Sequence, residues 1–238
     1  MKSLKKILPV LLSVFFISAP VFAHHLWMTT EDGMYAVNRG MISERIDDYD
    51  PDCVQKIRAY GQDGQEIPVQ RINEAEQVKF KTETTPAMTS VVSKWGDRVN
   101  TTRGKKLMSR EQAENEGLTV ISTFFSTQFS KTLFEPSEQN LKPLDMKFEI
   151  VPLQDPLSAD PDDALQFKLL FEGKPLGDTA IYTNDDRRIK TDENGVARIT
   201  FGQTGEHLLY AKHQSPPENG EKFDYLKFMT FLTFEVKQ

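Results

Sequence analysis

Apolar and polar residues alternate in short runs over most of the chain beyond residue 24, and turn residues separate these runs. This pattern is typical of half-buried antiparallel strands. The turn sequence Gly61-Gln62-Asp63-Gly64 lies between two such runs and predicts a β-hairpin. The apolar positions that flank the turn are Val54, Ile57, Ala59, Ile67, Val69 and Ile72.

Further strands are expected wherever the alternation resumes. They cover residues 78–80, 88–92, 118–134, 146–151, 165–171, 179–183, 196–201, 206–213 and 228–236. The periodicity of 118–134 fits a helix or a strand, and its content of Thr, Val, Ile and Phe favours a strand. One short helix is expected, because Ser109 and Gln112 have the spacing of a capping box and Gly117 is suited to end the helix.

The segment 135–145 is polar, contains two prolines and has the composition of a connection between domains. We therefore predict an all-β fold with two antiparallel β-sandwich domains and one short helix. The N-terminal β domain is expected at residues 24–134, the linker at 135–145 and the C-terminal β-sandwich at 146–238.

The first 23 residues have the pattern of a cleavable secretory signal peptide. Three lysines precede an apolar run over residues 7–22, and Val21 and Ala23 occupy the small-residue positions before the cleavage site. Pro9 and Pro20 interrupt the run, which is short for a membrane span. We expect cleavage after Ala23 and a periplasmic location, with an uncleaved anchor or a lipoprotein signal as the alternatives.

Charge and motif content narrow the class of function. Without the signal and its three lysines, 26 basic residues remain against 35 acidic ones, a net charge of −9. This balance argues against nucleic acid or anionic lipid as partners and is compatible with attracting cations. The single cysteine, Cys53, cannot form an internal disulfide. Nucleophile, phosphate-loop and dinucleotide motifs are missing from the sequence, so we expect a binding protein and no enzyme.

Two of the four histidines, His24 and His25, directly follow the predicted cleavage site. Cleavage would place a free amine beside two imidazoles, and together these nitrogens form a compact chelating group. The amine binds a metal either with the His24 imidazole or with an amide nitrogen and the His25 imidazole, and both modes stay open. Tetragonal nitrogen ligation suits Cu(II) or Ni(II).

The other two histidines, His207 and His213, are the expected sources of a further metal ligand. Their even spacing on one predicted strand puts both imidazoles on the same face. Six residues separate them by roughly 20 Å, so at most one is expected to join the N-terminus. We favour His213, which lies nearer the strand end and the following loop. The metal-site prediction thus comprises His24, His25, His213 and His207.

Several segments resemble a family of exported bacterial proteins that is uncharacterised and described as periplasmic components linked to nickel/cobalt uptake. These segments are AHHLWM, FEIVPLQDPLSADPDDALQFKLLFEGKPLGDTAIY, TDENGVARITF and GEHLLYAKH. The resemblance covers almost the whole chain after the signal. The C-terminal part also resembles immunoglobulin-like or prealbumin-like modules of exported proteins. The resemblance implies a β-sandwich fold and a part in metal uptake.

We therefore expect a periplasmic binding protein for a transition metal, nickel or cobalt and possibly copper, or for a small metal chelate, that assists an uptake system in the envelope. One alternative is a metal-free adhesion or assembly module. Another is a copper oxygenase with a histidine brace and aromatic residues that stack on a glycan. The aromatic residues concerned, which are also expected in the core, are Trp27, Trp95, Phe124, Phe125 and Phe129.

Overall fold

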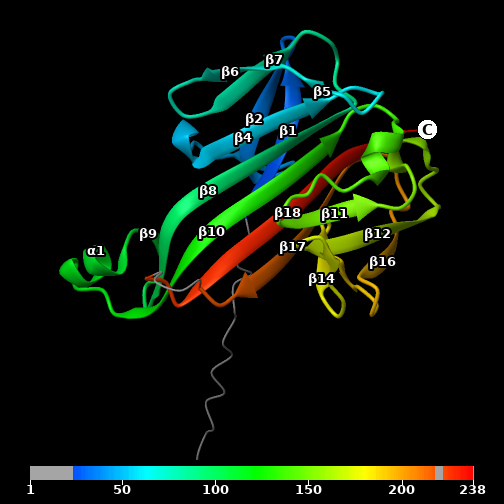
Figure 1. Ribbon diagram of the computed structural model, residues 1–238. Helices are drawn as coiled ribbons and strands as arrows, with labels where there is room; N and C mark the ends of the chain where they lie inside the picture. Colours follow the sequence, from blue (N-terminus) through cyan, green and yellow to red (C-terminus); the bar gives the residue numbers. More distant parts are fainter. Residues whose placement is uncertain (1–23, 218–221, 238) are drawn as a thin grey trace, which may run out of the picture.

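A computed structural model describes residues 24–217 and 222–237. The predicted signal peptide, residues 1–23, lies outside these described residues. The regular structure of the described chain consists mainly of strands in three sheets, with one short α-helix, which confirms the all-β prediction (Figure 1). Within the described residues, no helix has the length and apolar character that a membrane crossing requires.

The first sheet is formed by the N-terminal strands and has the order β1-β2-β7-β6, with β3 paired to β2. Its strands are β1 (His25–Glu31), β2 (Met34–Met41), β3 (Arg45–Ile46), β6 (Val69–Asn73) and β7 (Val78–Thr82). Asp32 and Gly33 join β1 to β2 with positive φ angles of 48° and 72°. Both values suit the tight turn of a two-residue hairpin.

The central sheet has nine strands in the order β15-β14-β17-β18-β10-β8-β4-β5, with β9 paired to β8. They are β4 (Val54–Tyr60), β5 (Glu66–Ile67), β8 (Met88–Thr101), β9 (Gly104–Leu107), β10 (Val120–Leu133), β14 (Ala180–Thr183), β15 (Arg188–Lys190), β17 (Gly205–Ser215) and β18 (Tyr225–Val236). β10 pairs with β18 in parallel, whereas its pairing with β8 is antiparallel.

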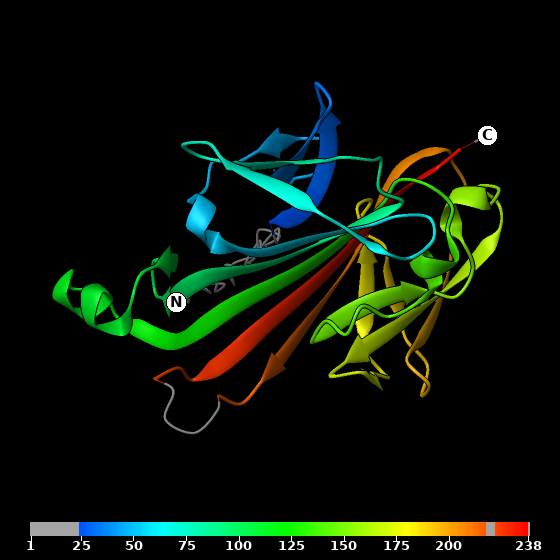
Figure 2. The ribbon, with the colours of Figure 1, turned by 45° about the horizontal axis from the view of Figure 1, so that its top comes forward.

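The third sheet is small and consists of β11 (Phe148–Pro152), β12 (Ala164–Phe171), β13 (Lys174–Pro175) and β16 (Val196–Thr200). It covers one face of the central sheet, and the first sheet covers the other (Figure 2). Successive side chains of β17 point to opposite faces of the central sheet and so pack into two different hydrophobic cores. Leu209 and Ala211 belong to the core shared with the third sheet, whereas Leu208 and Tyr210 belong to the core shared with the first.

The predicted short helix is confirmed as α1 (Arg110–Asn115). The hydroxyl of Ser109 accepts a hydrogen bond from the backbone N–H of Gln112, and the Gln112 side chain accepts one from the backbone N–H of Ser109. Three 3-10 turns complete the described elements: η1 (Pro51–Cys53), η2 (Glu138–Leu141) and η3 (Pro156–Ser158). The predicted strand over 118–134 is confirmed as β10.

The predicted hairpin around residue 62 is correct only in its first part. Ala59 pairs with Ile67 across the turn, but the second arm ends there. Pro68 has no N–H to donate to a ladder. The chain then leaves the central sheet, and Val69 begins β6 of the first sheet.

The central sheet combines strands from both predicted domains. The parallel pair β10–β18 joins residues 124–132 to residues 225–233. The predicted linker contains η2, and the Ser137 hydroxyl there donates a hydrogen bond to the Gln62 carbonyl at 2.9 Å. The two-domain division stays a prediction, and the structure adds that strands of both parts share one sheet.

Candidate functional site

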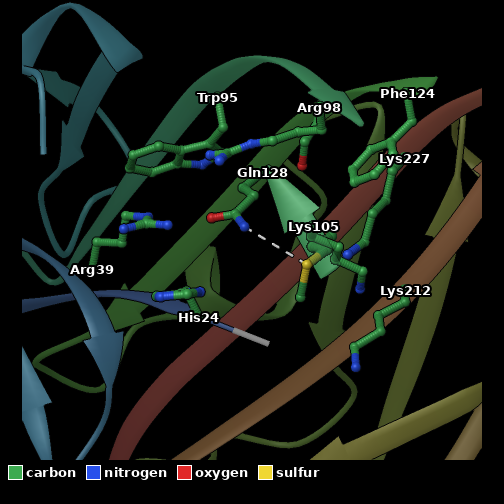
Figure 3. A pocket seen from close by; sticks show the side chains of 11 residues that line it. His24, Arg39, Trp95, Arg98, Lys105, Phe124, Gln128, Lys212 and Lys227 are labelled. Atoms are coloured by element: carbon green, nitrogen blue, oxygen red, sulfur yellow. Dashed lines mark hydrogen bonds between the residues drawn. The ribbon is translucent and has the colours of Figure 1, made fainter. Parts of the chain in front are cut away.

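A cavity of about 340 Å³ lies between the start of β1 and the face of the central sheet that the first sheet covers (Figure 3). Five cationic side chains from strands β2, β8, β9, β17 and β18 line it: Arg39, Arg98, Lys105, Lys212 and Lys227. The remaining lining residues are His24, Trp95, Phe124, Ser126, Gln128 and Met229. We call this cavity the basic pocket.

Residues of β10, β17 and β18 form the floor of the basic pocket, and the pairing register of these strands determines which side chains lie next to one another. In the parallel pair, Ser126 lies opposite Lys227 and Gln128 lies opposite Met229. In the antiparallel pair β17–β18, Lys212 lies opposite the same Met229. Lys212 and Lys227 are therefore diagonal neighbours on one face of the sheet, a position from which long side chains reach the same space.

A β-bulge in β8 brings Trp95 and Arg98 to the same wall. Thr127 pairs with Lys94 and Phe125 with Asp97, so Trp95 and Gly96 together lie opposite Ser126. Gly96 has φ +64°. The extra residue reverses the inside-outside alternation, and two side chains three positions apart thereby face the same way.

No acidic residue is among those that line the basic pocket. Across residues 24–217 and 222–237, the hydrogen bonds and ion pairs found involve none of the five cationic side chains. The nearest carboxylate to His24 is that of Asp47, whose Oδ2 lies 3.0 Å from His24 Nε2. Asp47 also pairs with Arg45, which does not line the pocket.

Burial and the repulsion of neighbouring cations lower the pKa values of two of these lysines, Lys227 and Lys212. Burial, together with the charges of Lys105, Lys212 and Arg98, lowers the pKa of Lys227 to about 8. Burial also lowers the pKa of Lys212, with a smaller contribution from Lys105. A desolvated group that lacks a counter-ion is an unfavourable arrangement, and an anion entering the pocket would relieve it.

Three buried polar atoms on the walls have no hydrogen-bond partner among the described residues: Arg39 Nε, Trp95 Nε1 and Gln128 Oε1. The Arg39 guanidinium lies over the Trp95 ring, with its central carbon 4.6 Å from the ring centroid. The Gln128 amide nitrogen contacts Met229 Sδ at 3.6 Å. Buried polar groups are nearly always hydrogen-bonded, so these three atoms retain unused hydrogen-bonding capacity at the pocket walls.

The two N-terminal histidines have different surroundings. His24 lines the basic pocket with 40 % of its side chain exposed, and burial followed by the charge of Arg39 lowers its pKa. His25 is buried, and its Nδ1 accepts a hydrogen bond from the backbone N–H of Ile42 at 3.3 Å. Its ring lies 5.2 Å from that of Tyr210, and burial lowers its pKa to about 4.

The two late histidines lie on the opposite face of the central sheet. The even spacing does put them on one face, together with Leu209 and Ala211 of the core shared with the third sheet. His207 hydrogen-bonds the Gln203 carbonyl through Nε2 at 3.0 Å, and the His213 ring lies 4.2 Å from that of Phe171.

The predicted shared site is therefore not assembled. Tyr210, which His25 contacts, points away from the face that carries His207 and His213. The sheet itself stands between the two pairs. In the part of the chain that the structure describes, no group of three or more His, Cys, Asp and Glu side chains is arranged to hold a metal ion. Metal binding by His24 and His25 alone stays a prediction.

A family model described as a domain of unknown function, DUF4198, matches residues 21–215. The chain belongs to this family. Comparison with curated proteins and with solved structures finds no match. The DUF4198 match ends with the last residue of β17. All strands that line the basic pocket, except β18, therefore lie within the matched region.

Sequence reasoning missed the basic pocket of this DUF4198 protein. Its cations come from positions 39 to 227 of a chain whose net charge is −6, so neither spacing nor composition indicates them. A weak signal exists in Lys212 and Lys227, each a lone cation within an apolar strand. Trp95 and Phe124 were candidates for core packing or for ligand stacking, and both are buried while lining the pocket.

Proposed function

We propose that this protein binds a small anionic ligand in the basic pocket. The observation that carries the proposal is the convergence of five cationic side chains from five strands, with no acidic residue in the lining. Among the described residues, no ion pair is found for any of these cations, although the charge of Asp47 acts on Arg39. A carboxylate or phosphate would form charge-assisted hydrogen bonds with several of them at once.

The walls also indicate the shape of the ligand. Trp95 and Phe124 offer apolar ring surface, and the orphaned Trp95 Nε1 and Arg39 Nε are two further donors. The free Gln128 Oε1 is an acceptor. A ligand with a flat part, several anionic oxygens and at least one donor would satisfy all of these groups.

The expected transition metal is compatible with the pocket only in a particular form. A bare divalent ion would meet the repulsion of five cations, whereas a metal held in a chelate of net negative charge would be attracted. His24 lies on the wall and offers an imidazole to such a metal. We therefore propose an anionic nickel, cobalt or copper chelate as one occupant, captured in the periplasm for an uptake system.

Isothermal titration calorimetry with oxalate, citrate, nickel citrate and Ni²⁺ alone tests the proposal. We expect the anions to bind and Lys212→Met to weaken them about 10- to 100-fold, the loss of one charge-assisted contact. Lys106→Met is the matched control, because Lys106 is exposed on β9 beside Lys105 but does not line the pocket. Absence of anion binding at millimolar concentration, or equal loss in both variants, would refute the proposal.

The metal arm of the same titration separates two sites. Binding of nickel citrate that depends on both Lys212 and His24 supports the chelate. Binding of Ni²⁺ alone that survives Lys212→Met would instead indicate a metal site that does not depend on the pocket's cations, as expected for His24 and His25 after cleavage.

A metal-free assembly module is the second candidate. Leu107 of β9 and Ile121 of β10 are large apolar side chains with 62 % and 65 % exposure, and these two strands precede and follow helix α1 in the chain. Such exposed apolar side chains are candidates for contact with a partner. An unchanged melting temperature across anions, chelates and divalent metals would favour this candidate, since a ligand of the folded state must raise stability.

A further inference from the structure

We propose that the Lys227 side-chain amine forms a reversible imine with an aldehyde or 2-oxo acid that carries an anionic group. This inference rests on the proposed function, because the same basic pocket must bind the anionic group. It adds a covalent step and a carbonyl-bearing class of ligand.

The surroundings of Lys227 are those of a nucleophilic amine. Its Nζ lies 5.7 Å from the centroid of the Phe124 ring and shares the pocket with the amines of Lys105 and Lys212. Among the described residues, no carboxylate pairs with it. A lysine that is desolvated and beside other cations holds its proton weakly, which leaves a reactive neutral fraction near neutral pH. The lowered pKa of about 8 agrees with this environment.

Lys227 is distinguished from the two neighbouring amines. Lys105 is exposed to solvent. Lys212 Nζ lies 5.3 Å and 5.2 Å from the ring centroids of Tyr182 and Tyr210, and two aromatic faces stabilise its charged form. Lys227 has one such ring, at a longer distance.

The remaining cations would position the substrate. Figure 3 shows Lys105 and Lys212 beside the space into which Lys227 extends, whereas the Arg98 side chain reaches toward Trp95. A carboxylate held by Lys212 or Lys105, the two amines whose charges act most on Lys227, would bring the adjacent carbonyl carbon toward Nζ, as orientation of the two reactants requires. Arg39 and His24 line the opposite side of the pocket from Lys227.

The reaction needs no oxidant or reductant. The lone pair of neutral Nζ attacks the carbonyl carbon, and the carbonyl π electrons move to oxygen, which takes up a proton while nitrogen loses one. The resulting carbinolamine expels its hydroxyl group as water after a second protonation. Nitrogen loses its remaining proton or stays as the iminium ion. Amine and carbonyl thus give imine and water, and hydrolysis reverses the step.

Reductive trapping with glyoxylate and cyanoborohydride, followed by peptide mapping, tests this inference. Hydride adds to the imine carbon and leaves a stable carboxymethyl group on the modified lysine. We expect modification at Lys227 at least tenfold faster than at any other lysine, and suppression of that reaction by oxalate. Lys227→Arg, which keeps the cation, should abolish the fast modification, whereas Lys106→Arg should leave it unchanged.

The outcomes separate the two proposals. Calorimetric binding of oxalate without preferential modification of Lys227 would overturn the imine and leave anion binding intact. Uniform slow modification of all lysines together with no oxalate binding would overturn both. Fast modification that persists in Lys227→Arg would assign the chemistry to another amine and likewise refute the inference.

Discussion

At the level of single side chains, burial decides which groups carry charge at neutral pH. His25 is enclosed by aromatic rings, and its pKa of about 4 keeps the imidazole neutral. Lys227 is also desolvated, and its pKa of about 8 leaves it mostly charged at pH 7 beside other cations. A buried cation without an ion-pair partner lowers the free energy of unfolding of the unliganded protein. Functional sites often carry such a cost because the same group binds the ligand.

Replacement of Lys227 by methionine should therefore stabilise the unliganded protein. The folded pKa lies below the unfolded value of 10.5, so the unfolded state binds more protons between pH 8 and 10.5 and stability rises with pH in that window. The penalty is fully present below about pH 8. We expect Lys227→Met to add on the order of 2 kcal/mol at pH 7.

Urea denaturation of both proteins at pH 7 and at pH 10.5 measures this effect. The difference in free energy of unfolding between Lys227→Met and wild type should be smaller at pH 10.5, because Lys227 is then neutral in the folded wild-type protein. A variant that is less stable than wild type at pH 7 would contradict the argument, and Lys106→Met provides the control for loss of a surface lysine.

At the level of elements, the two faces of a strand are set by a period of two, and one extra residue reverses them. In β17, the unbroken period puts His207 and His213 on the face away from the basic pocket. In β8, the bulge at Trp95 and Gly96 puts Trp95 and Arg98 on the pocket wall together. The pocket therefore depends on a local irregularity.

Substitution of Gly96 by alanine should weaken both the fold and the pocket. A Cβ at Gly96 meets only Leu107 Cδ1 at 3.9 Å, so the penalty comes from the left-handed backbone at φ +64°. We expect a loss of about 1 kcal/mol in stability and at least a fivefold loss in oxalate affinity.

Gly33→Ala is the matched control. Gly33 has φ +72° and lies in the turn between β1 and β2, and an added Cβ there would meet no atom within 4 Å. This variant should lose similar stability without loss of affinity. Denaturation and calorimetry on the two variants compare these effects. Equal affinity loss in both would show that the bulge has no particular part in binding.

At the level of the whole molecule, three sheets pack in layers, and the central one draws strands from both parts of the chain. A buried ion pair links the layers. Lys131 of β10 and Glu149 of β11 are each 1 % exposed, and Nζ lies 2.6 Å from Oε1. The Glu149 carboxylate also accepts hydrogen bonds from the backbone N–H of Leu144 at 2.9 Å and 3.0 Å.

Removal of one partner of this pair should be far more costly than removal of both. Glu149→Gln leaves an uncompensated buried ammonium, and we expect a loss of roughly 3 to 5 kcal/mol. The double variant Lys131→Met/Glu149→Met should recover most of that loss. Denaturation midpoints of the single and double variants provide the comparison, and a double variant as unstable as Glu149→Gln would contradict it.

Features encoded by neighbouring residues were predictable from the sequence. The alternation of apolar positions predicted many of the strands, the β-branched and aromatic content predicted β10, and the capping box at Ser109 predicted α1, whereas β1, β2 and β9 were not among the expected strands. Such signals depend only on backbone period and on local hydrogen bonds. For the same reason, the even spacing of His207 and His213 correctly implied a common face.

The tertiary structure alone decided which faces meet. No local feature of the sequence indicates that β10 pairs in parallel with β18, or that the chain leaves the central sheet at Pro68 and joins the first sheet. The same is true of the orientation of His207 and His213, which lie on the face of the sheet away from His24. The basic pocket arises because long-range strand order brings five cations together from distant positions. Local sequence determines each strand's own two faces, whereas packing between distant strands determines what each face contacts.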